Sequence, residues 1–222
     1  MEIHRLGSRA VACYLIKDDG IILVDGGMPG WGKRLVQQMS GLGFDPADVA
    51  LLVVTHGHWD HTGSVAALKE ATGCQVAIDH REVERLEVPV KVTPPGVNLW
   101  GKLMSLLNRL YMPLVRFPGV RPDVVFENRD FPLQPFGVSG SVLHTPGHTM
   151  GSVSVLLETG DAFVGDLAMN GLPLRIGPGM PPLAEDAVAV KDSWRLLLEK
   201  GAKRIYPAHG QPFGTEVLER AL

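Results

Sequence analysis

A buried strand runs directly into a cluster of metal-ligating side chains. Residues 49–54 are all apolar and predict a β-strand buried on both faces. The next residues read Thr55-His56-Gly57-His58-Trp59-Asp60-His61, and a helical pattern follows them. Side chains two positions apart in an extended loop point the same way, so His56, His58 and Asp60 can converge, while His61 enters at the turn. Three imidazoles and a carboxylate suit zinc or another divalent transition ion.

Three more candidate ligands lie where other predicted strands end. His148 lies in Pro146-Gly147-His148-Thr149, Asp166 directly follows Val164-Gly165, and His209 lies in Pro207-Ala208-His209-Gly210. Turns that leave a strand on a rigid scaffold are the usual place for functional side chains. Because one loop cannot supply every ligand of a two-metal site, we expect these residues to complete it.

Strand and helix signals alternate on both sides of the chain's midpoint. Residues 10–24 predict a β-hairpin around Lys17-Asp18-Asp19-Gly20. Other strands are expected at 76–78, 124–126, 142–145, 153–157, 162–165 and, as the last one, 204–206, with helices near 35–39, 65–68, 80–86 and 184–200. This alternation places the N-terminal half in the α/β or α+β group of folds. We expect residues 1–222 to form a single domain.

An insertion at about residues 88–122 interrupts this pattern. Prolines bracket an apolar stretch, 97–115, whose leucines recur at helical spacing: Leu99, Leu103, Leu106, Leu107, Leu110 and Leu114. They predict an amphipathic helix that Pro113 kinks or ends. Three roles are open: a lid over the site, a homodimer contact and a membrane-surface helix. The short stripe and few cations favour a lid or subunit contact, and an apolar lid would select a hydrophobic substrate.

The order His-x-His-x-Asp-His, Gly-His-Thr, Gly-Asp and His-Gly resembles the metallo-β-lactamase superfamily pattern over most of the chain. The resemblance implies an α+β fold, an αββα sandwich of two mixed β-sheets flanked by helices. It also implies two divalent metal ions, with Zn²⁺ favoured over Fe or Mn. The implied ligands are His56, His58 and His148 for the first ion, Asp60, His61 and His209 for the second, and Asp166 as the bridge. Asp25 would accept a hydrogen bond from a ligand histidine and fix its tautomer.

Differences between this sequence and the motifs of related enzymes narrow the range of possible activities. The β-lactamases that this chain resembles carry Cys or Ser at the bridging position, so Asp166 argues against antibiotic hydrolysis. Flavodiiron relatives carry a carboxylate where His58 stands. Lactonase relatives often place a tyrosine shortly after the bridging Asp, and residues 167–170 contain none. The metal site is glyoxalase II-like, but only 13 residues follow His209, so the helical domain of a full glyoxalase II is not expected.

The resemblance favours hydrolysis of an ester, thioester or lactone by a metal-bridging hydroxide. Two cations about 3.5–4 Å apart lower the pKa of a bridging water and polarise the substrate carbonyl. Asp60 is the expected catalytic carboxylate, because it lies beside that water and can orient it and receive its proton. Arg175 lies about where glutathione-handling relatives place a basic residue for substrate binding, although a solvated loop arginine is the favoured interpretation.

Two other functions stay open. One iron held by His56, His148 and Asp166 would suit oxygen chemistry of the persulfide dioxygenase type. Metal analysis with oxygen uptake would distinguish this activity from hydrolysis. A non-catalytic metal-binding module is disfavoured, because seven converging ligands exceed what a structural site requires.

The net charge and the N-terminal sequence predict the kind of partner and the cellular location. A net charge of -3 gives no general attraction to nucleic acid, so we expect a small-molecule substrate as the partner. The N-terminus lacks the pattern of a secretory signal, and no apolar stretch reaches the ~20 residues of a membrane span. Cys13 and Cys74 share no motif with each other or with a nearby histidine and are expected to be buried thiols. These features predict that the protein is located in the cytoplasm.

Overall fold

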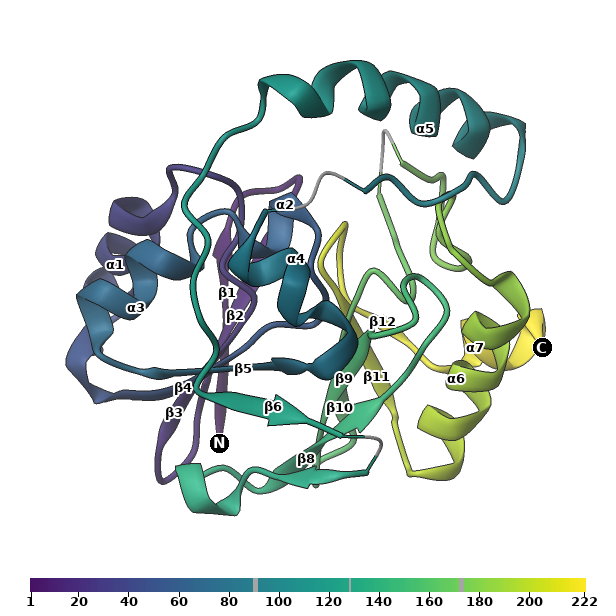
Figure 1. The fold of residues 1–222 in the computed structure, drawn as a ribbon. Coiled ribbons are helices and arrows are strands. Elements are labelled where there is room, and N and C mark those ends of the chain that lie inside the picture. The colour runs from purple at the N-terminus through teal and green to yellow at the C-terminus, as the bar shows by residue number, and fades with distance from the viewer. Residues whose placement is uncertain (90–91, 128, 172–173) are drawn as a thin grey trace.

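The computed structural model describes residues 1–89, 92–127, 129–171 and 174–222, which form two six-stranded β-sheets between helices (Figure 1). The first sheet has the order β1 (Glu2–Gly7), β2 (Ala12–Lys17), β3 (Ile21–Val24), β4 (Val49–Val53), β5 (Gln75–Asp79), β6 (Val124–Phe126). The second has the order β12 (Phe213–Gly214), β11 (Arg204–Pro207), β10 (Asp161–Gly165), β9 (Val153–Leu157), β8 (Gly140–His144), β7 (Phe131–Pro132). Both sheets combine parallel and antiparallel pairs, which confirms the predicted sandwich.

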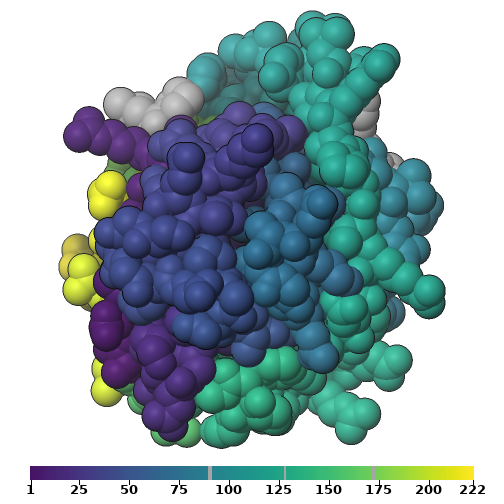
Figure 2. All heavy atoms as spheres, turned by 90° about the vertical axis from the view of Figure 1, so that its left-hand side faces the viewer, coloured from purple at the N-terminus to yellow at the C-terminus, as the bar shows by residue number. Residues whose placement is uncertain are grey.

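Helices cover the outer faces of the sheets. Helices α1 (Gly32–Gly41) and α3 (Val65–Thr72) lie on the first sheet and form the face seen in Figure 2, and α6 (Ala187–Glu199) lies on the second. The shorter elements are η1 (Pro46–Asp48), α2 (Trp59–Thr62), η2 (His80–Glu82), α4 (Val83–Glu87), η4 (Gln134–Phe136) and α7 (Glu216–Ala221). No helix in the described ranges is long and apolar enough to span a bilayer.

Alternation of side chains along the strands divides the core into three clusters. In β2, Cys13 and Leu15 belong to the cluster under α1 and α3, whereas Tyr14 and Ile16 belong to the cluster between the sheets. The third cluster fills the space between the second sheet and α6 around Trp194, which is fully buried. Cys13 and Cys74 are buried free thiols, as predicted.

Most of the predicted elements are confirmed, and the differences lie at the sheet edges. The hairpin of β2 and β3 forms as expected. The prediction missed β1, whose first four residues are only partly buried and carry no clear alternation. The strand at 204–206 is not the last, because the two-residue β12 pairs with it and α7 follows. Helix α6 starts later than expected because Asp186 caps it, accepting hydrogen bonds from the backbone N–H groups of Val188 and Ala189.

The segment after α4 leaves the first sheet and returns at β6, which pairs with β5. It contains α5 (Leu99–Tyr111) and η3 (Met112–Leu114), and α5 crosses the top of the molecule in Figure 1. The predicted helix is thus confirmed. Its apolar stripe is not buried, however: all six leucines that predicted it are exposed. The leucines therefore do not pack against the protein, and the role of this segment stays a prediction.

The packing of α6 gives a stability prediction. Replacing Trp194 by Ala empties a fully buried site and removes the hydrogen bond from its indole Nε1 to the carbonyl of Leu167, 3.0 Å away. We expect a loss of about 3–5 kcal/mol in the free energy of unfolding, measured by urea denaturation. Val188→Ala on the exposed side of the same helix should change it by less than about 0.5 kcal/mol. Equal losses in the two variants would contradict this packing.

Candidate metal centre

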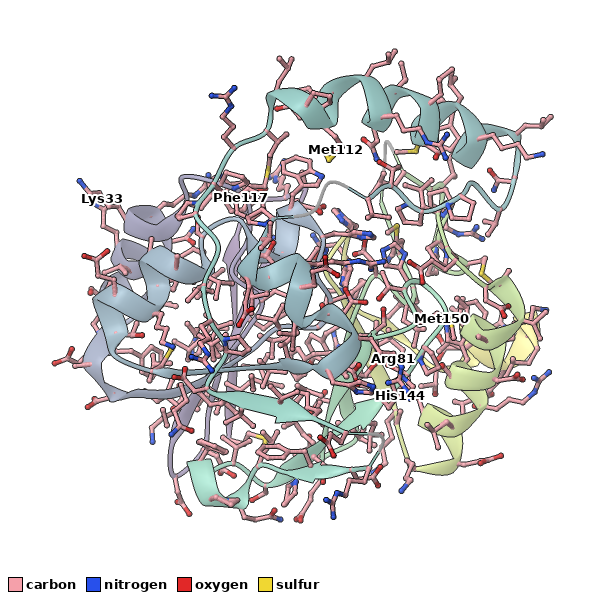
Figure 3. All side chains as sticks on the ribbon, viewed as in Figure 1. Lys33, Arg81, Met112, Phe117, His144 and Met150 are labelled. Atoms are coloured by element: carbon pink, nitrogen blue, oxygen red, sulfur yellow. The ribbon has the colours of Figure 1, made fainter. Side chains whose placement is uncertain are left out.

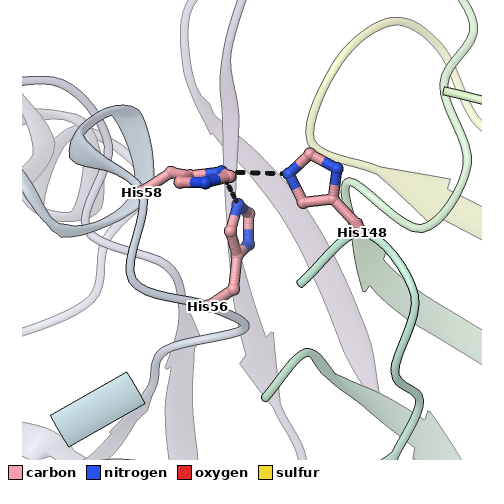
Figure 4. A group of neighbouring side chains, drawn as sticks. All are labelled: His56, His58 and His148. Atoms are coloured by element: carbon pink, nitrogen blue, oxygen red, sulfur yellow. Dashed lines mark hydrogen bonds between the residues drawn. The ribbon is translucent and has the colours of Figure 1, made fainter. Parts of the chain in front are cut away.

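The loop after β4 brings the first ligands together. Its residues His56 and His61 are buried, and His58 precedes α2, which begins at Trp59. Nδ1 of His58 lies 2.8 Å from Nε2 of His56 and 3.0 Å from Nε2 of His148, which comes from the turn after β8 (Figure 4). Three nitrogens around a zinc ion with Zn–N bonds of about 2.0–2.1 Å would lie only slightly farther apart, at roughly 3.3 Å. The three rings therefore form a trigonal face for one cation.

Hydrogen bonds outside this cluster set the tautomers of two of its rings. Nδ1 of His148 donates to the carbonyl oxygen of Leu183 at 2.8 Å, which leaves the lone pair of its Nε2 facing the cluster. Nδ1 of His56 lies 3.1 Å from the hydroxyl of Thr55. That hydroxyl donates to the Asp25 carboxylate, so it accepts from His56 and leaves Nε2 of His56 unprotonated. Such outer hydrogen bonds orient histidines that ligate metals.

A second cluster lies beside the first. Nε2 of His209 is 3.2 Å from Oδ2 of Asp60, and Nε2 of His61 is 4.0 Å from the same oxygen. Nδ1 of His209 donates to the carbonyl oxygen of Ala10 at 2.8 Å, which again turns Nε2 inward. These ligand atoms come from α2, which follows β4, and from the turn after β11.

Asp166, directly after β10, lies between the two clusters. Its Oδ2 is 3.5 Å from Nε2 of His148 in the first cluster. Its Oδ1 is 3.3 Å from Nε2 of His61 and 3.4 Å from Nε2 of His209 in the second. Oδ1 of Asp166 and Nε2 of His61 are buried without a hydrogen-bond partner among the described residues. Buried polar atoms are rarely left unpaired, so the site fits cations between these groups.

Asp25 supports both His61 and the ligand loop. Its carboxylate accepts hydrogen bonds from Nδ1 of His61 at 2.8 Å and from the backbone N–H of Thr55 at 2.8 Å. Asp25 itself adopts φ = 64°, a left-handed conformation that Asp and Asn tolerate better than other side chains. The sequence predicted an acceptor role for Asp25, and the structure adds Thr55 as the link to His56.

The electrostatics of the two clusters differ. Burial lowers the pKa of His56, His58 and His148, which keeps these rings neutral and able to ligate a cation. Burial also acts to lower the pKa of His209, but Asp166 and Asp60 outweigh it and raise that pKa to about 10. The carboxylates thus attract positive charge to the second cluster, and a divalent ion can supply it in place of protons.

Comparison with known proteins decides the family. The profile of the metallo-beta-lactamase superfamily matches residues 6–209. The chain belongs to the metallo-β-lactamase superfamily. It is 27% identical over 207 residues to the probable metallo-hydrolase MJ0888 of Methanocaldococcus jannaschii, covering 89% of this chain and 86% of that protein. It is 28% identical over 162 residues to the hydroxyacylglutathione hydrolase GloC of Haemophilus influenzae, covering 72% and 67%.

Solved structures of the superfamily share the fold. One is BJP-1, a subclass B3 metallo-β-lactamase of Bradyrhizobium japonicum, with a TM-score of 0.64 and 24% identity. The match covers 93% of this chain and 74% of that structure.

This superfamily member holds its ligand loops with a partly buried ion-pair chain that the sequence did not reveal. Glu82 accepts a hydrogen bond from the backbone N–H of Gly57 at 3.0 Å, between His56 and His58. Arg85 joins Glu82, at 3.0 Å, to Glu185, at 2.9 Å. Glu185 in turn accepts from the backbone N–H of Met150, near His148. The only signal in the sequence was a charged stretch after a strand, which also fits a solvent-exposed helix.

A pocket opens over the metal centre of this metallo-β-lactamase superfamily chain. Its floor contains His58, Asp60, His148, Asp166 and His209. Its walls are mainly apolar and include Trp59, Val92, Pro94, Met104, Met112, Met169, Leu174, Pro182 and Leu183. Thr93 and Asn108 are the polar wall residues among those described. Helix α5 thus lines the pocket with Met104 and Asn108, η3 adds Met112, and the leucine stripe lies elsewhere.

Arg175 lies outside the described lining of this pocket, although its neighbour Leu174 belongs to it. The Arg175 side chain is half-buried, and its guanidinium donates to the carbonyl oxygen of Met180 at 3.2 Å, within the same loop. Any contact of Arg175 with a substrate would require this side chain to turn from its own loop toward the pocket.

The hydrogen bonds of Asp25 give a prediction for metal affinity. Asp25→Asn keeps the shape and tolerates the left-handed backbone, but it replaces the carboxylate acceptor of His61 by a neutral amide. We expect zinc affinity to fall about 10- to 100-fold, measured by competition with a chromophoric chelator. Asp45→Asn, an exposed cap of η1, serves as the control and should not change the affinity. Unchanged affinity in Asp25→Asn would contradict the supporting role of this carboxylate.

Proposed function

We propose that the chain is a binuclear metal-dependent hydrolase that cleaves an ester, thioester or lactone of a small, hydrophobic molecule. The position of Asp166 carries this proposal, because its two carboxylate oxygens face different clusters of ligand atoms. His56, His58 and His148 would hold one ion, and Asp60, His61 and His209 the other, with Asp166 shared. Imidazole and carboxylate donors suit zinc.

When bound, the cations would supply the chemistry that polarises the substrate carbonyl and lowers the pKa of the attacking water. Among the chain's own groups, Asp60 is placed to orient that water, because its side chain borders the pocket. Burial acts to raise the pKa of Asp60, but His61 and His209 hold it at about 2. An ionised carboxylate at this position can accept a hydrogen bond from the attacking water. Asp60 would therefore orient the attacking water, accept its proton and pass that proton to the departing oxygen or sulfur.

The pocket walls support a hydrophobic substrate. Apolar side chains dominate them, and few polar groups other than the ligands are available to fix a substrate's orientation. The name of the relative GloC describes hydrolysis of an acyl compound, which supports the proposed reaction class.

The direct test combines metal analysis with a substrate panel. The protein is purified without added metal, and zinc, iron and manganese are measured per chain. Hydrolysis of acyl thioesters, esters and lactones is then followed beside oxygen uptake with a persulfide. We expect hydrolysis and no oxygen uptake. Iron with oxygen uptake and no hydrolysis would contradict the proposal and favour a persulfide dioxygenase.

Removing the charge of Asp166 tests the binuclear assignment. In Asp166→Asn a neutral amide replaces the bridge between two cations, so we expect metal content below that of wild type. The value of kcat/KM should fall at least about 100-fold, since the nucleophile depends on both ions. Asp161→Asn, at the other end of β10, is the matched control and should keep both properties. Full metal content and activity in Asp166→Asn would exclude this assignment.

The wall formed by α5 gives a prediction for specificity. Met104→Trp adds bulk inside the pocket and should raise KM for a long-chain acyl substrate about tenfold or more, with a smaller effect on an acetyl substrate. Val188→Trp adds the same bulk to an exposed position of α6 and should leave both KM values unchanged. Steady-state kinetics on the two substrates measures this difference. Equal effects on both substrates would show that Met104 does not contact the acyl chain.

A further inference from the structure

The apolar side chains of α5 face solvent and its small or polar side chains face the protein, which is the reverse of a helix that packs on a protein core. Its five leucines and Leu114 of the following η3, together called the outer face of α5, are exposed, and Leu99, Leu110 and Leu114 reach 85%, 70% and 76% of full exposure. The inward side carries Gly101, Met104, Ser105 and Asn108, and Met112 continues it at the start of η3. A contiguous exposed apolar face of this kind marks an interaction surface.

The outer face is exposed although α5 is attached to the rest of the protein. Asn98 caps α5 by accepting a hydrogen bond from the backbone N–H of Gly101 at 2.7 Å. The hydroxyl of Ser105 donates to the carbonyl oxygen of Pro94 at 3.0 Å, and Met112 lies beneath the helix, toward the body of the protein (Figure 3). The preceding strand-like stretch is also tied down, because the N–H of Val97 donates to the carbonyl oxygen of Pro182. The helix is therefore held with its leucines outward.

The charge of this segment differs from that of the rest of the chain. Residues 88–122 hold five of the 21 cationic side chains, Lys91, Lys102, Arg109, Arg116 and Arg121, and none of the 24 acidic ones. Lys91 lies outside the described residues. In helical projection, Lys102 and Arg109 border the leucines on one side, and Trp100 and Tyr111 border them on the other. Lys102 and Arg109 are exposed.

We propose that the outer face of α5 docks on the surface of an anionic lipid bilayer. Leucines facing outward can enter the boundary between headgroups and acyl chains, with the tryptophan and tyrosine at the interface. The flanking cations match a surface of lipid phosphates. A second copy of the chain fits less well, because this segment offers no acidic side chain to pair with those cations. The sequence alone favours a lid or a subunit contact for this helix, and the exposed leucines lead us to favour the membrane-surface role instead.

Docking in this way sets the distance between the active site and the lipid. Met104 and Asn108 line the pocket from the side of α5 opposite the leucines. A docked helix would therefore hold the pocket about one helix diameter, roughly 10–12 Å, from the headgroups. This inference does not depend on the reaction proposed above, because vesicle binding is measured without turnover.

Vesicle co-sedimentation of the full-length protein tests the proposal. We expect binding to phosphatidylcholine vesicles that contain phosphatidylglycerol, and weaker binding to phosphatidylcholine alone. Leu103→Glu/Leu107→Glu should reduce binding to the anionic vesicles at least tenfold, whereas Leu42→Glu/Val188→Glu, with the same charge change at exposed sites elsewhere, should keep it. Lys102→Gln/Arg109→Gln should weaken it about 30-fold, as two surface cations each contribute about fivefold. Circular dichroism checks that each variant is folded.

Three results would overturn the proposal. The first is no binding of the wild-type protein to anionic vesicles. The second is vesicle binding that Leu103→Glu/Leu107→Glu leaves unchanged. The third is a wild-type dimer in sedimentation velocity that the same double variant dissociates, with no vesicle binding, which would make the outer face a subunit contact.

Discussion

The structure depends on holding many buried ligand atoms close together. Five imidazoles and two carboxylates meet at one edge of the sandwich, and two of their inward-facing atoms, Nε2 of His61 and Oδ1 of Asp166, have no hydrogen-bond partner among the described residues. Burying such groups is costly unless a charge compensates them. The surrounding scaffold therefore has to be rigid before any cation binds. Asp25 with Thr55, and Glu82 with Arg85, provide that rigidity under the ligand loop.

The two sheets each deliver part of the site. The first sheet supplies the ligand loop after β4, and the second supplies His148, Asp166 and His209 after β8, β10 and β11. Contacts between the sheets fix their relation at this edge, because the hydroxyl of Tyr14 in β2 donates to the carbonyl oxygen of Pro207 at 2.7 Å. The bond from His209 to Ala10 crosses the same boundary. The relative positions of the ligand atoms thus depend on the packing of both sheets and not on one loop alone.

The sequence predicted the strands that carry the site, because their apolar runs are long and their ligands stand at recognisable spacing. It could not predict Glu82, since a buried acid in a charged stretch looks like a solvated one until its partner Arg85 and the Gly57 N–H are placed. The edge strands β1, β7 and β12 were missed, because β1 is largely polar and the other two have only two residues each. The leucine spacing of α5 predicted a helix correctly, but periodicity states only that an apolar face exists. It does not say whether protein, lipid or a second subunit covers that face.

The claim that one carboxylate joins two cation sites can be measured most directly by crystallography. Crystals grown with zinc would be measured on both sides of the zinc absorption edge to locate anomalous scatterers. We predict two peaks per chain, one among His56, His58 and His148 and one among Asp60, His61 and His209, with the Asp166 carboxylate between them. A single peak at saturating zinc, or peaks away from these residues, would contradict the account.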